Sequence, residues 1–237
     1  MKYNWNDEER DITIDQGFCT FNYGFEFLDC HQRIIITPDT LTSMLSLTNA
    51  LGIKYGAACY GYHAMGKTET IKELAKLMGI FFIDFNCSAT MNVVQLSCLL
   101  RGLIQSGTWV NFSNLFIVKP EVLSIIGEHL YALRNASLAN LKKFEVGGYE
   151  VQLNHNYGVF VTSPAETSQE IPESTKDYFR PVSIATIDSK LIVEAELIAQ
   201  GFTSASEWAY KITSFINACR DEFSRDQSQT YGMTTIR

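Results

Sequence analysis

Eight residues in the first third of the chain have the types and spacing of a phosphate-binding loop. Gly61, Gly66, Lys67 and Thr68 occupy the fixed positions of the pattern G-x-x-x-x-G-K-[S/T]. The glycines let successive backbone N–H groups point into one concavity, and a helix that begins at Lys67 adds its positive N-terminal dipole. Lys67 can reach the outer phosphates of a nucleotide, and the Thr68 hydroxyl can bind Mg²⁺. These residues therefore predict nucleotide binding.

The variable positions of this loop carry larger side chains than an anion nest usually holds. They are Tyr62, His63, Ala64 and Met65, and Glu69 follows in the expected helix. Ala64 lies where a glycine would adopt a positive φ more easily. We take residues 61–69 together as the cofactor-binding segment and assign no catalytic role to His63.

Strand and helix signals alternate on both sides of the loop. Residues 57–60 form a short apolar strand before it, and residues 68–78 carry apolar side chains at helical spacing after it. Further strands are expected at 80–85, 108–118, 157–163 and 182–186, further helices at 40–51, 92–105, 120–141, 188–200 and from 204 onward, and a hairpin at 144–153. This alternation is typical of an α/β fold with a parallel sheet.

The same signals divide the chain into three parts. Residues 1–17 are polar, and we expect a flexible N-terminal arm there. Residues 18–187 form the large α/β nucleotide-binding subdomain, and residues 188–237 form a partial helical subdomain.

Composition excludes several classes of partner. The net charge of −7 argues against binding to nucleic acid or to an anionic membrane surface, since either would require a basic face. The apolar runs are far shorter than the roughly 20 residues that span a bilayer. The chain has six cysteines without metal-ligand spacing, and its start has no signal-peptide character, so we expect a reduced intracellular protein.

Hydrolysis of a bound nucleotide needs a carboxylate for Mg²⁺ and a group that activates water. In such proteins these groups end a buried strand that neighbours the loop strand, and the expected strand at 108–118 contains neither Asp nor Glu. Ser113 and Asn114 are its only mid-strand polar side chains besides Asn111. Asp84, on a different strand, is an alternative metal partner.

Several ordered motifs resemble the first AAA+ module of dynein heavy chains. They are NYGFEFL at 22–28, IITP at 35–38, GKTET at 66–70, FNCS at 85–88, GTW at 107–109, EVLS at 121–124, YFRPV at 178–182 and YGM at 231–233. The resemblance implies a P-loop AAA+ three-layer α/β sandwich with a central parallel sheet, followed by a partial small helical subdomain. It also implies that Ile36, Thr37 and Pro38 flank the adenine.

The departures from this family fall at the site. Ser113 stands where the family has its Mg²⁺-binding Asp, and Asn114 where it has its catalytic Glu. Ser163 replaces the sensor asparagine, and Thr234 replaces the arginine that follows the YGM motif. The resemblance therefore implies binding of ATP or ADP, with Mg²⁺ at Thr68, and it leaves the chain without its expected catalytic carboxylates.

Three functions remain open on these residues. The first is a dynein-like ATP-binding module with impaired hydrolysis, the second an active motor fragment whose Mg²⁺ and base come from other positions, and the third a structural or assembly module that no longer binds nucleotide. By resemblance, the expected partners are other dynein AAA+ modules or dynein subunits, with microtubules contacted only indirectly. The expected location is the cytoplasm, the cytoskeleton or the axoneme of a cilium.

Overall fold

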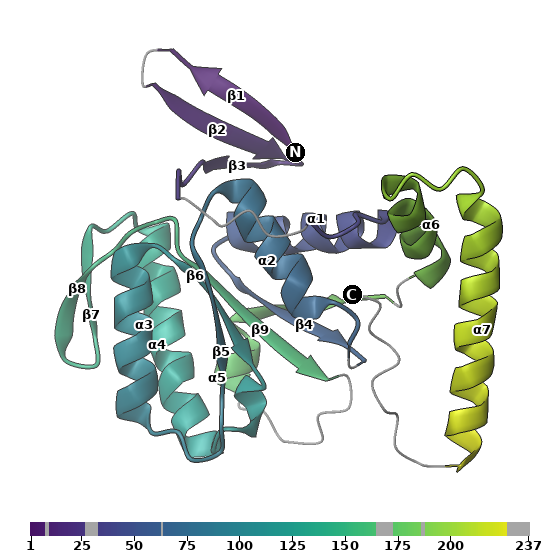
Figure 1. The fold of residues 1–237 in the computed structure, drawn as a ribbon. Coiled ribbons are helices and arrows are strands. Elements are labelled where there is room, and N and C mark those ends of the chain that lie inside the picture. Colours follow the sequence, from purple (N-terminus) through teal and green to yellow (C-terminus); the bar gives the residue numbers. More distant parts are fainter. Residues whose placement is uncertain (8–9, 27–32, 63, 165–172, 186–187, 227–237) are drawn as a thin grey trace.

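A five-stranded parallel sheet forms the centre of the molecule in the computed structural model, which describes residues 1–7, 10–26, 33–62, 64–164, 173–185 and 188–226 (Figure 1). The strand order is β10-β4-β9-β6-β5. The bounds are β4 Gly56–Gly61, β5 Phe82–Asn86, β6 Trp109–Ser113, β9 Gly158–Pro164 and β10 Phe179–Ser183. Strands β4, β9 and β6 carry almost continuous apolar runs because they are buried on both faces.

Helices cover both faces of this sheet and make the expected three-layer α/β sandwich. Helices α1 (Pro38–Gly52) and α2 (Lys67–Met78) lie on one face, and α3 (Val93–Ser106) and α4 (Pro120–Leu138) on the other (Figure 1). Each face has its own apolar core. Trp109 and Phe160 face α1 and α2, whereas their neighbours Val110 and Val161 face α3 and α4, as the alternation along a strand requires.

The N-terminal segment corrects the prediction of a flexible arm at residues 1–17. Strands β1 (Lys2–Asn6), β2 (Asp11–Gln16) and β3 (Cys19–Asn22) form an antiparallel sheet of their own. Ile14 of β2 is fully buried in the core that α1 and α2 share. Polar residues dominate this segment because one of its faces is solvated, while a single buried isoleucine anchors the other.

Several short elements lie between the larger ones. Strands β7 (Lys143–Val146) and β8 (Tyr149–Gln152) form the expected hairpin, with positive φ at both Gly147 and Gly148. A 3-10 turn η1 (Leu115–Ile117) follows β6, and α5 (Glu173–Lys176) precedes β10.

The C-terminal part is helical, as expected. Helices α6 (Ser189–Ala199) and α7 (Ala205–Asp226) pack on each other beside the sandwich (Figure 1). Several of their large apolar side chains are exposed, among them Ile198, Trp208 and Phe215. None of the described helices combines the length and the apolar character that crossing a membrane requires.

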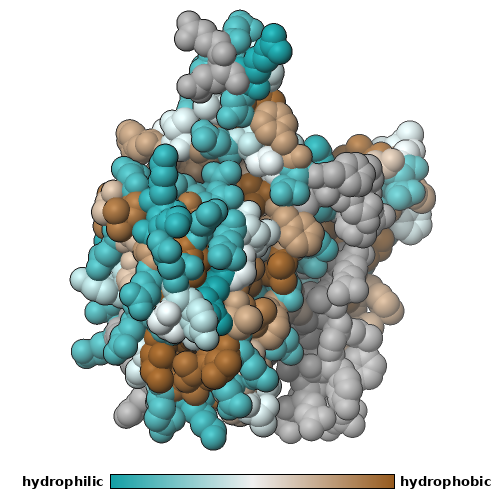
Figure 2. Space-filling view, turned by 90° about the vertical axis from the view of Figure 1, so that its left-hand side faces the viewer, coloured by the Kyte–Doolittle hydropathy of each residue, from teal (hydrophilic) through white to brown (hydrophobic). Residues whose placement is uncertain are grey.

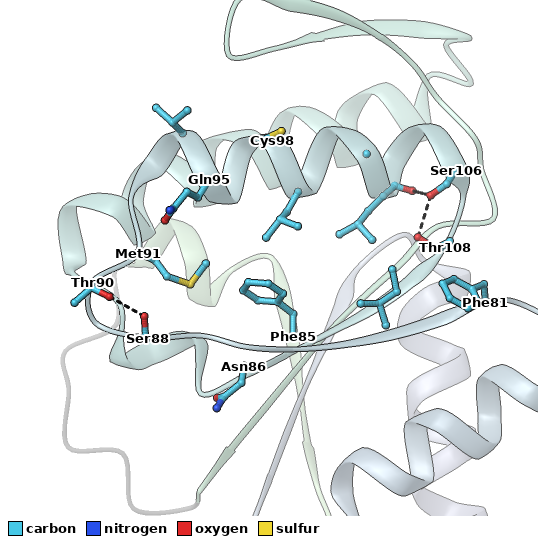
Figure 3. A pocket seen from close by; sticks show the side chains of 15 residues that line it. Phe81, Phe85, Asn86, Ser88, Thr90, Met91, Gln95, Cys98, Ser106 and Thr108 are labelled. Carbon is cyan, nitrogen blue, oxygen red and sulfur yellow. Dashed lines mark hydrogen bonds between the residues drawn. The ribbon is translucent and has the colours of Figure 1, made fainter. Parts of the chain in front are cut away.

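The surface around α3 and the β7–β8 hairpin is mainly hydrophilic, with hydrophobic side chains gathered in separate patches (Figure 2). A groove of about 1060 Å³ runs between α3 and the edge strand β5. Phe81, Phe85 and Met91 line it, and Figure 3 shows Phe85 directed into it while Asn86 points to the opposite side of the strand. The odd-numbered residues of β5 therefore face α3, and the even-numbered ones face the layer of α1 and α2.

Candidate functional site

The predicted phosphate-binding loop connects β4 to α2. It leaves the sheet at Gly61, and α2 begins at Lys67. Ala64 and Gly66 both have left-handed backbone geometry, with φ of 62° and 72°, so Ala64 does occupy a position that favours glycine. No described side chain caps the N-terminus of α2. Its first backbone N–H groups therefore remain available to an anion, which is the arrangement that binds phosphate.

The side chain of Lys67 folds back and bonds to the start of this loop. Its Nζ donates hydrogen bonds to the carbonyl oxygens of Gly61, at 2.9 Å, and Tyr62, at 2.6 Å. Burial lowers the pKa of the Lys67 ammonium from 10.5, and the neighbouring Cys59 opposes this shift. Burial also raises the pKa of the Cys59 thiol to about 12, which keeps that residue neutral. The Lys67 ammonium is therefore held against the backbone of the first two loop residues, Gly61 and Tyr62.

The other predicted loop residues differ in their surroundings. Thr68 is half-buried in the first turn of α2, and its hydroxyl bonds to no other described residue. Glu69 and Tyr62 are exposed, whereas Met65 packs against the core beneath the loop. Thr70, which the motif did not single out, donates from its hydroxyl to the carbonyl oxygen of Gly66 at 2.8 Å and steadies the turn. The prediction for His63 lies outside the described residues.

The predicted adenine-side residues form the start of α1. Thr37 caps this helix by accepting a hydrogen bond from the backbone N–H of Thr40, and Pro38 is its first residue. Ile36 is exposed just before the cap. Ile36, Thr37 and Pro38 therefore lie at the start of a helix, and their contact with adenine stays a prediction.

The strand with Ser113 and Asn114 lies one position farther from the loop strand than the sequence suggested. Strand β9 is inserted between β4 and β6, so the prediction that β6 neighbours the loop strand is wrong. Strand β6 also ends at Ser113, earlier than the predicted limit at residue 118, because Asn114 takes a left-handed backbone conformation with φ of 59°. Ser113 and Asn114 nevertheless stand at the carboxyl end of the sheet, the edge from which the loop also emerges.

A polar network joins three strands at this edge. The Asn111 amide donates to Asp84 Oδ1 at 2.7 Å and to Thr162 Oγ1 at 3.1 Å. The Ser113 hydroxyl donates to Asp84 Oδ1 at 2.9 Å, and it lies 3.1 Å from Thr162 Oγ1. The structure thus brings Ser113 together with Asp84. The involvement of Thr162 was missed, although a buried asparagine such as Asn111 signals that partners must lie nearby.

Asn114 is held by two contacts. Its backbone N–H donates to the carbonyl oxygen of Thr162 at 2.9 Å, and its side-chain amide donates to Asn86 Oδ1 at 3.3 Å. An amide at this position can orient a water molecule by hydrogen bonding, but it has no basic atom to remove a proton.

Ser163 and Thr234 are the two other departures from the family pattern. Ser163 is buried, and its hydroxyl has no hydrogen-bond partner among the described residues. Thr234 lies outside the described residues. Nowhere in the described ranges do three His, Cys, Asp or Glu side chains gather as a metal site. A cation here would instead need the oxygen atoms of phosphate together with the hydroxyls and the carboxylate at the sheet edge, which is how Mg²⁺ accompanies nucleotides.

Comparison with known proteins agrees with this geometry. The family model described as "Hydrolytic ATP binding site of dynein motor region" matches residues 23–237. Human dynein axonemal heavy chain 10 is 33% identical over 239 aligned positions, and the flagellar inner arm I1 dynein-1-alpha heavy chain of Chlamydomonas reinhardtii is 30% identical over 239. The cytoplasmic dynein heavy chain of Paramecium tetraurelia is 31% identical over 243.

Each of these alignments covers 100% of this chain but only 5% of the relative, so the chain corresponds to a small part of a dynein heavy chain. The loop, the central parallel sheet and the match from residue 23 onward confirm the resemblance noted from the motifs. The chain belongs to the family of the hydrolytic ATP-binding site of the dynein motor region.

Proposed function

We propose that this chain is a degenerate copy of the first AAA+ module of dynein, which binds ATP or ADP and hydrolyses ATP slowly or not at all. The observation that carries the proposal is the end of β6, where Ser113 and Asn114 supply no carboxylate to the edge of the sheet. The phosphate-binding loop retains the left-handed backbone conformation at Gly66 and the side chain of Lys67. It also leads into α2, whose N-terminus has no side-chain cap. Binding and hydrolysis are therefore separated in this module.

Binding rests on groups that act in the ground state. The N–H groups of the loop and of α2 would surround the phosphates, and Lys67 would exchange its two carbonyl partners for phosphate oxygens. Thr68 is the residue that would contact Mg²⁺, which neutralises phosphate charge. None of these groups can activate water.

Loss of general-base help alone lowers a rate by roughly 10²- to 10⁴-fold. Asn114 is held by hydrogen bonds to Asn86 and Thr162. Its amide can orient a water molecule but cannot remove a proton from it. We therefore expect turnover far below the roughly 1 s⁻¹ that marks the lower end of working enzymes.

In its cellular setting, this module would act beside other dynein AAA+ modules or dynein subunits. Its relatives include axonemal and cytoplasmic heavy chains, so the cytoskeleton or the axoneme of a cilium is the expected place. Movement along microtubules would require further modules, because the chain has the extent of one module and aligns with only 5% of dynein axonemal heavy chain 10.

A thermal-shift measurement tests the binding half of the proposal. At a ligand concentration of 100 Kd, a nucleotide that binds only the folded state adds about 2.7 kcal/mol to the free energy of unfolding. We expect Mg-ADP and Mg-ATP to raise Tm in the wild type but not in Lys67→Ala. Lys143→Ala, which removes an exposed partner of Glu150, is the matched control and should keep the full shift. An unchanged wild-type Tm would favour the structural module that no longer binds nucleotide.

A further inference from the structure

The edge strand β5 carries a carboxylate on the face of the sheet that holds the phosphate-binding loop. Asp84 pairs with Asn111 of β6, and Asn86 pairs with Ser113 at the next position on the same face. Figure 3 shows that Asn86 points away from the groove that Phe85 enters. Phe82, on the same face as Asp84, packs against the core formed with α2. Asp84 therefore lies on the α2 side of the sheet, near its carboxyl end.

Two hydrogen bonds fix one oxygen of this carboxylate and leave the other available. Oδ1 accepts both the Ser113 hydroxyl, at 2.9 Å, and the Asn111 amide, at 2.7 Å. Oδ2 accepts no hydrogen bond from any described residue, and the Asp84 side chain is exposed at this edge. A carboxylate held through one oxygen with the second facing solvent can bind a cation without rearrangement.

A second observation concerns Asn111, whose amide nitrogen belongs to the same cluster. Asn111 is fully buried, and its Oδ1 has no hydrogen-bond partner among the described residues, while its amide donates to Asp84, Ser113 and Thr162. A buried acceptor without a partner costs free energy unless a water molecule or a cation satisfies it. The described residues therefore leave two acceptors unsatisfied, the buried Asn111 Oδ1 and the exposed Asp84 Oδ2.

The charge of the cluster also depends on Asp84. Ser113, Asn111 and Thr162 are neutral, so Asp84 is the anionic member of the network. Mg²⁺ at a nucleotide site commonly uses one or two carboxylates, hydroxyl or water oxygens and the phosphates of the ligand. Asp84 together with the hydroxyls of Ser113 and Thr68 supplies that set of protein donors.

We infer that Asp84 replaces the missing carboxylate of position 113 and, with Ser113 and Thr68, forms the divalent-cation site of the bound nucleotide. The carboxylate has moved from the end of β6 to the neighbouring strand β5, and the Ser113 hydroxyl positions it. This inference rests on the proposed nucleotide binding. It restores the charge that holds Mg²⁺ without restoring a base, because Asn114 remains an amide.

Mn²⁺ as a probe for Mg²⁺ tests this assignment directly. The quantity to measure is the metal-dependent gain, the ratio of ATP affinity with Mn²⁺ to ATP affinity in EDTA, together with the electron paramagnetic resonance signal of protein-bound Mn²⁺. We expect Asp84→Asn to lower this gain by about 10- to 100-fold, the usual cost of losing a partner of a bound metal. The affinity for ADP in EDTA should stay unchanged, because the loop does not depend on Asp84.

Two further variants serve as a control and as a rescue. Asp177→Asn removes an exposed carboxylate next to α5 and should leave the gain unchanged. The double variant Asp84→Asn with Ser113→Asp moves the carboxylate back to β6 and should restore the gain. It also answers the question if Asp84→Asn alone folds poorly, since the carboxylate then returns to the same network.

The outcomes separate the two proposals. A full metal-dependent gain in folded Asp84→Asn overturns the role of Asp84 and leaves nucleotide binding intact. Equal wild-type affinity in Mn²⁺ and in EDTA does the same. A wild-type protein that binds ATP in neither condition overturns the proposed function and this inference together.

Discussion

The hydroxyl of Ser113 donates a hydrogen bond to Oδ1 of Asp84 across the boundary between β6 and β5, with 2.9 Å between the two oxygens. The same carboxylate oxygen accepts the amide of Asn111 at 2.7 Å. Strand β6 therefore ends in a hydroxyl at the carboxyl end of the sheet. The negative charge beside this hydroxyl comes from Asp84 on the neighbouring strand β5. This arrangement explains how a module without its expected carboxylates can retain a place for a cation.

Adding carboxylates to the end of β6 should raise hydrolysis. We expect Ser113→Asp with Asn114→Glu to increase ATP turnover by about 10²-fold or more, because a general base contributes at least that factor. The matched control is Ser113→Asn with Asn114→Gln, which has the same size without the charge. Turnover measured with Mg-ATP decides the matter, and equal rates for the two double variants would contradict the view that the missing carboxylates limit hydrolysis.

The Asn114→Glu change by itself should reduce the stability of the fold. Asn114 has φ of 59°, and asparagine tolerates this left-handed conformation better than glutamate does. We expect Asn114→Glu to reduce the free energy of unfolding by about 1 kcal/mol, which chemical denaturation can measure. Asn114→Gly should not show this loss, since glycine adopts a positive φ freely. Equal losses for glutamate and glycine would show that the backbone conformation is not the cause.

Nucleotide affinity should depend on pH through Lys67. Burial lowers the pKa of this ammonium from 10.5, so the charge is lost at a lower pH than in an ordinary lysine. ADP affinity, measured in EDTA, should therefore fall as the pH rises toward 10.5. Lys67→Arg should give a flat profile, because a guanidinium stays charged. A wild-type profile as flat as that of Lys67→Arg would contradict a direct role for the Lys67 charge.

The lowered pKa of Lys67 makes the stability of the fold rise with pH, whereas nucleotide affinity falls. The charged form is penalised in the folded state, so this residue costs stability at pH values below its folded pKa. The cost disappears as the pH rises through the folded pKa toward 10.5, the value for an exposed lysine. Lys67→Ala should lack this contribution.

The N-terminal sheet should contribute to global stability. Ile14 is fully buried against α1 and α2, so Ile14→Ala should lower the free energy of unfolding by about 2–5 kcal/mol, the usual range for such a truncation. Ile198→Ala, at an exposed position of α6, should change it by less than about 0.5 kcal/mol. Urea denaturation compares the two, and a negligible effect at Ile14 would reinstate the flexible arm.

Local signals in the sequence predicted much of the fold. Apolar spacing after Gly66 places α2 correctly, and Gly147-Gly148 marks the turn of the β7–β8 hairpin. These features depend on neighbouring residues, so a short window of sequence is enough. The residues of the loop predicted its local geometry for the same reason, including the positive φ of Ala64, a variable position of the motif.

Relations between distant segments could not be predicted in this way. The insertion of β9 between β4 and β6 follows from how the whole sheet is assembled, and no local pattern encodes it. The contact of Asp84 with Ser113 depends on the register of two strands separated by α3. The N-terminal strands were missed because, among the described residues of this polar segment, Ile14 is the one fully buried apolar side chain.

The fate of ATP bound to the protein tests the central claim most directly. Wild-type protein is mixed with radiolabelled Mg-ATP, and the protein-bound nucleotide is separated and identified as ATP or ADP over time. We predict that ATP binds and persists on the protein, with conversion far slower than about 1 s⁻¹, and that Lys67→Ala retains almost none. Conversion of bound ATP to ADP at about 1 s⁻¹ or faster, or the absence of bound nucleotide from the wild type, would contradict the account.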